Sequence, residues 1–465
     1  MKTLIQLTIL VFFLSLLINS CTKPDGSGDS NSESAPTVIT NVNVLTMLDP
    51  GILENQTVVV ENGRVTQIGP SLEFETIPGA ILINAKGKFL MPGLTEMHAH
   101  IPTNDDEYVQ EVLFLYLSNG VTTIRGMLGD PYHLELKRKV ESKEVLSPRI
   151  YTSGPSLNGK SVTNAEDAVR MVREQKEAGY DFLKFHPGLK LEVFEALVST
   201  ADEVGIGFAG HVSTAVGIQR ALDAGYASID HMDGYVEGLV PLESEVDPNE
   251  NGFFGYNFTD LADTSRISQL VKRTIDMGVW VVPTQSLLER IFSTATGESM
   301  AEQSEMRYIS SETLGNWIER KNQMLENPEY SLDRSEKFIE IRRRLIKELF
   351  DQGAGIALGS DAPQIFNVPG FSIHHELETY IASGLTIFQA LQIATVNPAR
   401  YFNSEDEFGS IKVGTSADLV LLRGNPLDDL ENLKNPEGVM VRGNWLDRST
   451  IENRLELIAN KYADK

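Results

Sequence analysis

Two histidines one residue apart, His98 and His100, end the stretch FLMPGLTEMHAH. Alternate side chains of a strand point to the same face, so a strand here presents both imidazoles on one side. Neutral imidazoles are ligands for Zn²⁺ and similar divalent ions, which makes metal binding the first chemistry to consider. The pair alone does not decide between two metal ligands and two incidental histidines, because further ligands must come from elsewhere in the chain.

Four further residues with suitable chemistry lie in similar apolar runs: Lys184 in FLKFH, His211 in AGHVS, His231 in SIDHM and Asp361 in LGSDAP. The chain has only eight histidines, so four of them at the ends of such runs is an uneven distribution. A lysine ammonium has no lone pair and is a poor ligand. Lys184 is therefore either a chemically modified ligand or a salt-bridging lysine, and its apolar neighbours indicate a buried strand.

From Leu90 onwards, short apolar runs alternate with amphipathic helical stretches that end at or near a glycine. The runs are FLMPGLTEMHAH, GVTTIRGM, RIYTSGP, YDFLKFHP, IGFAGHVS, ASIDHMD, WVVPTQS and GIALGSDAP. Eight strands separated by helices predict an α/β fold, a (β/α)8 TIM barrel over residues 90–406. Such barrels carry their catalytic groups at the carboxyl ends of the strands. The long connections 234–278 and 287–353 are candidate lids.

The segments on either side of the barrel have the alternation of β-strands. QTVVVENGRVTQIG indicates two strands joined by an Asn62-Gly63 turn. Strand patterns return in FGSIKVGTSADLVLLRG and GVMVRGNWLD. We predict that residues 37–89 and 407–447 pair into one small sheet domain built from both chain ends, followed by a C-terminal helix or tail over residues 448–465.

The N-terminal residues indicate export. Lys2 precedes the apolar run LIQLTILVFFLSLLIN, which is short for a membrane span and favours a signal peptide over residues 1–20. Cys21 follows in a sequence that resembles a bacterial lipobox, whose cysteine is lipidated; an uncleaved anchor helix is the alternative. Residues 21–36 have the composition of a flexible tether. We expect an exported protein, lipid-anchored at Cys21 in the bacterial envelope, on the periplasmic face or the cell surface.

Composition limits the partners. A formal net charge of -25 argues against nucleic acid, because phosphate binding needs a basic surface. A single cysteine provides no disulfide framework. The contents of 41% hydrophobic and 23% charged residues are typical of globular proteins. A small-molecule substrate is expected, and assembly into a homo-oligomer is left open.

The order HAH, Lys, His, His and Asp resembles the amidohydrolase superfamily, in its binuclear-metal class with a carbamylated lysine. VVVENGRVTQIG and GSIKVGTSADLVLLRGNPLDDL resemble the two halves of that superfamily's composite β-sandwich, so the similarity runs from about Thr37 to about Trp445. GHVSTAVGIQRALDAGYASIDHMDGY and HHELETYIASGL resemble imidazolonepropionase-like enzymes and the group of metal-dependent prolidases and Xaa-amino-acid carboxypeptidases.

This resemblance implies two divalent metal ions, zinc first among them, and CO2 bound as a lysine carbamate. It implies one ion on His98, His100, Lys184 and Asp361, and the other on Lys184, His211 and His231. A hydroxide bridging the ions would attack an amide carbonyl. Asp361 would take its proton and deliver it to the leaving nitrogen.

Substrate contacts are less specific. Tyr235 is either a donor to the substrate carbonyl or carboxylate, or an ordinary loop tyrosine. Arg125 either neutralises a substrate carboxylate or forms a buried ion pair, and His186 either faces the pocket or packs in the core. His374, His375 and Glu376 are predicted to pack and to cap a helix, and His133, which has no companions, is predicted to lie on the surface.

The sequence therefore predicts a metal-dependent hydrolase that cleaves a C–N amide bond in a dipeptide or N-acyl amino acid. A cyclic amide such as imidazolone propionate is the alternative substrate. A deaminase is less favoured, because that branch generally lacks the bridging lysine. A binding lipoprotein on an inactive barrel is the rival class, and the retained Asp361 counts against it. The third-strand loop SGPSLNGKSVTN lacks the Gly-Gly-His segment often found in related dipeptidases, which weakens the case for dipeptides.

Overall fold

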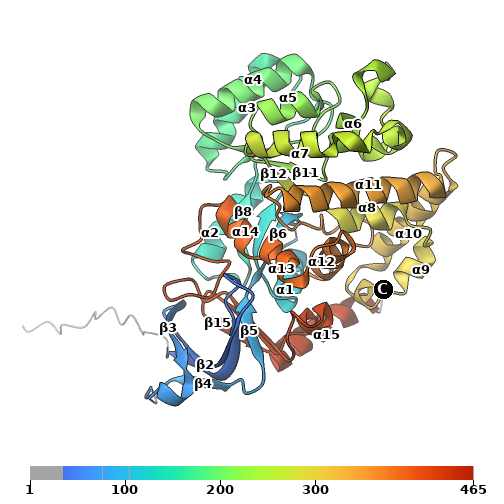
Figure 1. The fold of residues 1–465 in the computed structure, drawn as a ribbon. Helices are drawn as coiled ribbons and strands as arrows, with labels where there is room; N and C mark the ends of the chain where they lie inside the picture. Colours follow the sequence, from blue (N-terminus) through green and yellow to red (C-terminus); the bar gives the residue numbers. More distant parts are fainter. Residues whose placement is uncertain (1–34, 76, 104, 464–465) are drawn as a thin grey trace, which may run out of the picture. The chain divides into compact units, whose positions relative to one another are not determined.

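Both ends of the described chain contribute to one β-sheet (Figure 1). This computed structural model describes residues 35–463 apart from Thr76 and Asn104. The predicted signal peptide over residues 1–20, the lipidated Cys21 and most of the tether lie outside the described residues. None of the helices described is both long enough and apolar enough to cross a membrane.

The sheet has the strand order β15-β14-β13-β5-β1-β2-β3, and β4 pairs with β1. Its strands are β1 (Thr37–Leu45), β2 (Ile52–Glu61), β3 (Arg64–Pro70), β4 (Ile81–Asn84), β5 (Phe89–Pro92), β13 (Leu419–Leu422), β14 (Gly438–Val441) and β15 (Asn444–Asp447). The two chain ends meet where β13 runs antiparallel to β5, with Val420 opposite Met91. Pairing between the two ends is confirmed, whereas a sandwich of two facing sheets is not.

The predicted hairpin is confirmed between β2 and β3, where Glu61 pairs with Arg64. Asn62 and Gly63 both have left-handed backbones, with φ of 52° and 77°. Such a two-residue turn matches the twist of the flanking strands. A Cβ at Gly63 would lie 2.7 Å from the carbonyl oxygen of Arg442, so the C-terminal segment also requires glycine here.

Parallel strands form two further sheets of three and four strands. They are β6 (Leu94–Ala99), β7 (Val121–Gly126) and β8 (Arg149–Thr152), then β9 (Leu183–Phe185), β10 (Phe208–Gly210), β11 (Ser228–Asp230) and β12 (Trp280–Val282). These seven strands coincide with the first seven predicted runs. The fold is therefore a mixed α/β fold, as predicted.

A closed barrel ladder is not confirmed, because the eighth run, GIALGSDAP, makes only isolated bridges. Ile356 bridges Val281 of β12, and Ala362 bridges Ala99 of β6. The run is nevertheless hydrogen-bonded to the β6 segment: the N–H of Met97 donates to the carbonyl oxygen of Leu358 at 2.8 Å, and the N–H of Asp361 donates to that of His98 at 3.0 Å. Asp361 has φ of 62°, which ends the extended geometry that a regular strand needs. Single bridges likewise connect β8 to β9, including Ser153 with Phe182.

Helices follow most of the parallel strands, and two long connections add more (Figure 1). The helices are α1 (Asp106–Ser118), α2 (Pro131–Glu141), α3 (Ala165–Ala178), α4 (Leu191–Val204), α5 (Gly217–Asp223), α6 (Tyr235–Gly238), α7 (Ile267–Asp276), α8 (Gln285–Phe292), α9 (Gly297–Ala301), α10 (Ser311–Glu326), α11 (Leu332–Asp351), α12 (Ser372–Ala382), α13 (Ile387–Ala394), α14 (Val396–Tyr401) and α15 (Arg448–Ala463).

The predicted glycine stops are seen after two of these helices. Asn164 caps the start of α3, where its side chain accepts from the backbone N–H of Asp167, and Gly179 caps the end with φ of 91°. α4 ends at Gly205 with φ of 64°. Glycine adopts this left-handed cap without the steric cost that a side chain brings.

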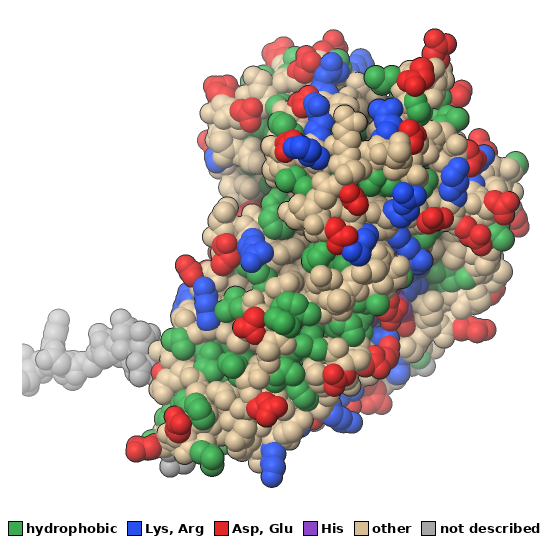
Figure 2. Space-filling view, viewed as in Figure 1, with side chains coloured by type: hydrophobic (Ala, Val, Ile, Leu, Met, Phe, Trp, Pro, Cys, Tyr) green, Lys and Arg blue, Asp and Glu red, His purple; other side chains and the backbone are tan. Residues whose placement is uncertain are grey.

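Charged side chains of both signs are spread over the face drawn in Figure 2. Asp and Glu side chains alternate there with Lys and Arg, and no broad basic area appears on that face.

Candidate metal centre

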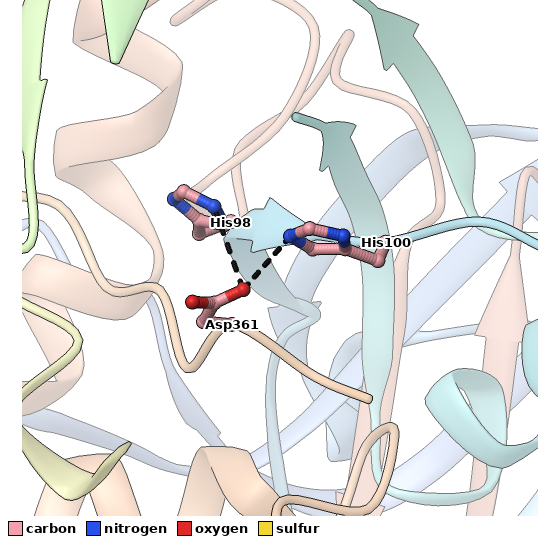
Figure 3. Close-up of side chains that lie close together, drawn as sticks. All are labelled: His98, His100 and Asp361. Carbon is pink, nitrogen blue, oxygen red and sulfur yellow. Dashed lines mark ion pairs between the residues drawn. The ribbon is translucent and has the colours of Figure 1, made fainter. Parts of the chain in front are cut away.

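Three ligand atoms, one each from His98, His100 and Asp361, lie within 4.8 Å of one another (Figure 3). Nε2 of His100 is 2.8 Å from Oδ1 of Asp361, and Nε2 of His98 is 3.6 Å from the same oxygen. Nε2 of His100 and Oδ1 of Asp361 are nevertheless buried without a hydrogen bond, since their angles do not suit one. Buried polar atoms are normally satisfied, so this donor set fits a cation.

Strand geometry explains the first two positions, and a left-handed backbone explains the third. His98 lies on β6 and His100 directly follows its last residue, Ala99; the alternation continues through His100, so both rings lie on one side, with centroids 5.5 Å apart. Asp361 has φ of 62°, which turns its side chain toward them from the eighth run. Glu96 connects the two segments, because its carboxylate accepts from the backbone N–H groups of His98 and Ser360 at 2.8 and 2.9 Å. Burial raises the pKa of Glu96 to about 8.

His231 and His211 extend this cluster into a row of imidazoles. The ring centroids of His98 and His231 are 4.5 Å apart, and those of His231 and His211 are also 4.5 Å apart. Side-chain exposure is 2% for His98 and His231 but 18% for His100 and 12% for His211. The row therefore opens toward solvent at its His100 and His211 ends. Burial lowers the pKa of His98 and His231 well below the ordinary value, which keeps both rings neutral.

Polar groups lie beside the Nδ1 atoms of three of these rings. Nδ1 of His211 is 3.1 Å from a carboxylate oxygen of Asp233, and Nδ1 of His231 is 2.8 Å from Oγ1 of Thr284. Nδ1 of His231 also lies 3.7 Å from Oδ2 of Asp361. Metal-binding histidines usually donate their other ring nitrogen to such a group, which fixes the tautomer and the ring orientation.

Asp230 is the third such partner, and it also contacts Lys184. Its Oδ2 lies 3.1 Å from Nδ1 of His98, at ion-pair distance but without hydrogen-bond geometry. The same oxygen is 3.3 Å from Nζ of Lys184, which is completely buried on β9. Burial lowers the pKa of Lys184, although Asp230 opposes this shift. Lys184 therefore lies beside the histidine row at ion-pair distance from Asp230, and its predicted role as a metal ligand stays a prediction.

Arg125 forms the buried ion pair that was one of its two predicted roles. Nη2 of Arg125 is 3.0 Å from Oδ1 of Asp230. Its other nitrogens donate to the carbonyl oxygen of Met97 and to the hydroxyls of Ser228 and Tyr401. With every nitrogen engaged and none of its surface exposed, this guanidinium is not available to a substrate carboxylate.

Two further candidates differ in where they lie. Tyr235 is fully buried in the apolar core, and its hydroxyl is 2.9 Å from Oγ1 of Thr274 on α7. The structure does not bring this hydroxyl to the histidines, so its contact with substrate stays a prediction without support from its position. His186 does lie at the row: its ring centroid is 5.2 Å from that of His211, and Nδ1 is 2.7 Å from Oγ of Ser156. Burial lowers the pKa of His186 to about 2.

The expectation of a surface position for His133 is wrong. This residue is fully buried on α2, with Nε2 3.1 Å from the carbonyl oxygen of Ile101. An amphipathic helix buries the side chains on one of its faces, and His133 lies on the buried face of α2.

His374, His375 and Glu376 are structural, as predicted. His374 contacts Oδ1 of Asn119, and His375 contacts Glu305. The Glu376 carboxylate accepts from the first two backbone N–H groups of α8, so it caps a helix other than its own.

Sequence reasoning missed the residues that orient the histidines. Asp230 and Asp233 flank His231 in SIDHMD, so proximity in the sequence was a usable signal. Thr284 comes from another segment and carried no such signal. A separate cavity of about 980 Å³, lined by residues of α5 and α7, contains none of the six predicted ligands.

Residues 89–446 match the family described as the Amidohydrolase family. The chain belongs to this family. Membership confirms the predicted superfamily and the predicted class of enzyme, a hydrolase of carbon–nitrogen bonds. Amidohydrolases generally use divalent metals, which agrees with the arrangement of His98, His100 and Asp361.

Relatives match this amidohydrolase over very different lengths. An imidazolonepropionase from Geobacillus sp. (strain WCH70) is 26% identical over 416 residues, covering 84% of this chain and 88% of that protein. An adenine deaminase from Ruegeria sp. (strain TM1040) is 31% identical over 154 residues, which is 30% of this chain and only 24% of that protein. A crystal structure of a Xaa-Pro dipeptidase with bound methionine has a TM-score of 0.63 at 19% identity, covering 89% of this chain and 100% of that chain. This last likeness shows a shared fold.

Proposed function

We propose that this amidohydrolase cleaves the amide C–N bond of a small substrate, a dipeptide or N-acyl amino acid, using two divalent ions, with zinc as the first choice. The observation that carries the proposal is the row of four imidazoles beside Asp361, with neutral rings at its centre and three Nδ1 atoms facing polar partners. His98, His100 and Asp361 would hold one ion, and His211 and His231 the other. Bound ions act as Lewis acids on the carbonyl and acidify water.

Asp361 is suited to move a proton within this site. Its carboxylate faces His98, His100 and His231, and 9% of its side chain remains exposed where the substrate would enter. We assign it the acceptance of a proton from the attacking water and its delivery to the leaving nitrogen. One group performs both steps when it lies within hydrogen-bond reach of each atom.

Lys184 would join the two ions as a carbamate. Burial favours its neutral amine, which is the form that adds to the carbon of CO2; a proton leaves the nitrogen, and an anion results. This anion would lie beside the carboxylate of Asp230. Arg125 pairs with the other oxygen of that carboxylate and would offset part of the added negative charge.

The proposal also covers the closed barrel, the composite domain and the lipid anchor. The bridges at Ile356 and Ala362 connect the last strand of one parallel sheet, through the eighth run, to the first strand of the other, which supports a closed (β/α)8 barrel over residues 90–406. Residues 37–89 and 407–447 would form the separate composite domain, followed by the C-terminal segment 448–465. The lipobox-like sequence at Cys21 supports an exported, lipid-anchored enzyme.

A cyclic amide is the second candidate substrate. The relative named imidazolonepropionase spans most of both chains, which favours imidazolone propionate as the cyclic amide. Comparing imidazolone propionate with dipeptides and N-acyl amino acids as substrates of one enzyme preparation separates the two proposals.

Metal analysis combined with a substrate panel tests the proposed function. We expect about two zinc ions per chain after reconstitution with zinc and bicarbonate, together with hydrolysis of at least one amide in the panel. His100→Asn should lower the metal content, whereas His375→Asn, at a histidine outside the row, should not. A protein that binds no metal and hydrolyses none of these amides would contradict the proposal.

A further inference from the structure

Phe254 lies over two of the histidines from a segment that the metal-site prediction did not include. Its ring centroid is 5.1 Å from that of His231 and 5.9 Å from that of His211, and it stacks on His211 with an interplanar angle of 18°. Phe254 belongs to the 3-10 segment η4 (Phe253–Leu261), within the long connection between β11 and α7. An aromatic side chain therefore covers the His211 end of the row, where the site opens to solvent.

The backbone around Phe254 is built for this position. Phe254 has φ of 54° and ψ of 40°, a left-handed conformation that a bulky residue rarely adopts. Glycines lie on both sides in the sequence Gly252-Phe253-Phe254-Gly255, and a Cβ at Gly255 would lie 2.7 Å from Oε2 of Glu237. Residues held in uncommon backbone conformations cluster at binding sites, so the conformation of Phe254 points to a role in binding.

Contacts at both ends of the segment hold the turn in place. Asn251 donates to Oε1 of Glu237 at 2.7 Å, and the Tyr256 hydroxyl donates to the carbonyl oxygen of Ser331 at 3.0 Å. Asp260 accepts from Arg334 at 3.0 Å. Phe254 is thus supported by two α-helical regions and does not depend on its own ring contacts for its place.

A second phenyl ring continues this surface. Phe253 packs edge-on against Phe254 with centroids 4.4 Å apart, and 49% of its surface is exposed. His186, whose Nδ1 is 2.7 Å from Oγ of Ser156, lies against His211 and not against these two rings. We define the aromatic wall as Phe253 and Phe254.

We propose that the aromatic wall is the subsite for a planar apolar group, and that Phe254 determines a preference for amides with an aromatic ring next to the scissile bond. This inference rests on the proposed function. Flat rings pack on aromatic faces in offset or edge-on arrangements. The wall offers two phenyl rings for such packing, one beside the histidines and one about half exposed. Phe254 packs against two of the proposed metal-binding histidines and would also contact the substrate. Its role would be to select the substrate, not to transfer a proton.

Two matched pairs of amides test the preference: N-benzoylglycine against N-acetylglycine, and N-acetylphenylalanine against N-acetylalanine. We expect kcat/KM of the aromatic member to exceed that of its partner about tenfold in at least one pair, as one well-filled apolar pocket can achieve. Phe254→Ala should reduce that ratio to near one, and Phe254→Tyr should preserve it. Leu261→Ala, which removes a 44% exposed apolar side chain from the same segment, is the matched control and should leave the ratio unchanged.

Binding measurements make the result independent of hydrolysis. Titration calorimetry of the four amides into zinc-loaded Asp361→Asn protein should show about tenfold tighter binding of the aromatic member, and Asp361→Asn/Phe254→Ala should lose that difference. If Phe254→Ala does not fold, as judged by circular dichroism and zinc content, Phe254→Leu takes its place.

The outcomes distinguish the two proposals. An aromatic preference that survives Phe254→Ala, or is absent from the native protein, overturns the subsite. Binding that follows Phe254 while no amide is hydrolysed overturns the proposed function and supports the subsite.

Discussion

Asp230→Asn removes a carboxylate that contacts two cations, Arg125 and Lys184, at 3.0 and 3.3 Å. Neither the carboxylate nor either cation has any exposed surface, so water does not screen the change. Removing one partner from a buried ion pair costs about 3–5 kcal/mol, because a charge is left buried and uncompensated. We therefore expect the free energy of unfolding of the metal-free protein to fall by about 3–5 kcal/mol.

The same substitution should cost less after reconstitution with zinc and bicarbonate. In the proposed carbamate state Lys184 is an anion, so asparagine at position 230 removes a like charge from its vicinity. Urea unfolding followed by circular dichroism, in both states, measures the two losses. Asp263→Asn, at an exposed aspartate, is the control and should change stability by less than about 0.5 kcal/mol. Equal losses in the two states would refute the change of charge at Lys184, and a loss below about 1 kcal/mol in the metal-free protein would refute the charge arrangement itself.

Four other predictions follow from individual residues. Lys184→Ala should lose activity and part of the bound metal, with partial recovery when short carboxylates are added; full activity without them would exclude the carbamate. Asp361→Asn should retain much of the metal and lose turnover, which metal analysis and steady-state kinetics measure together. Burial lowers the pKa of His375, but Glu305 raises it to a net value above the ordinary 6.5, so the contribution of this pair is complete below pH 6.5 and lost as the pH rises through the folded-state pKa. His375→Gln should accordingly lower the thermal midpoint near pH 6 more than near pH 9. Cys21→Ser should release the protein from the membrane fraction, as cell fractionation would show.

The sequence predicts where a side chain lies on its own strand or turn better than it predicts which distant residues that side chain contacts. Alternation sufficed to place His98 and His100 on one face, because strand geometry is local. The turn at Asn62-Gly63 was equally predictable, since the left-handed backbone it needs favours these two residue types. Nothing local indicated that the backbone at Asp361 would be left-handed, which is what turns its carboxylate toward β6.

Contacts across long sequence separations were not predictable. Phe254 reaches His231 only because its segment is held against distant helices. The barrel was predicted from the count of apolar runs, and the sandwich from strand patterns at both chain ends and the family resemblance; neither shows how closely neighbouring runs approach. Gly359 shows the difference, because its lack of a side chain lets the eighth run pass close to His98, beside a strand with which it forms few bridges.

Pairing of β5 with β13 also dictates when the enzyme becomes complete during synthesis. β5 leads directly into β6, and Gly93 between them donates its N–H to the carbonyl oxygen of Asp418, more than 300 residues further along the chain. A contact at this separation forms slowly, because a very long loop must close first. The β5 end of this segment is thus fixed to β13 only when nearly the whole chain is available, although β6 itself pairs with β7 much earlier in the chain. A chain truncated before Asp361 would also lack the third residue of the candidate metal cluster.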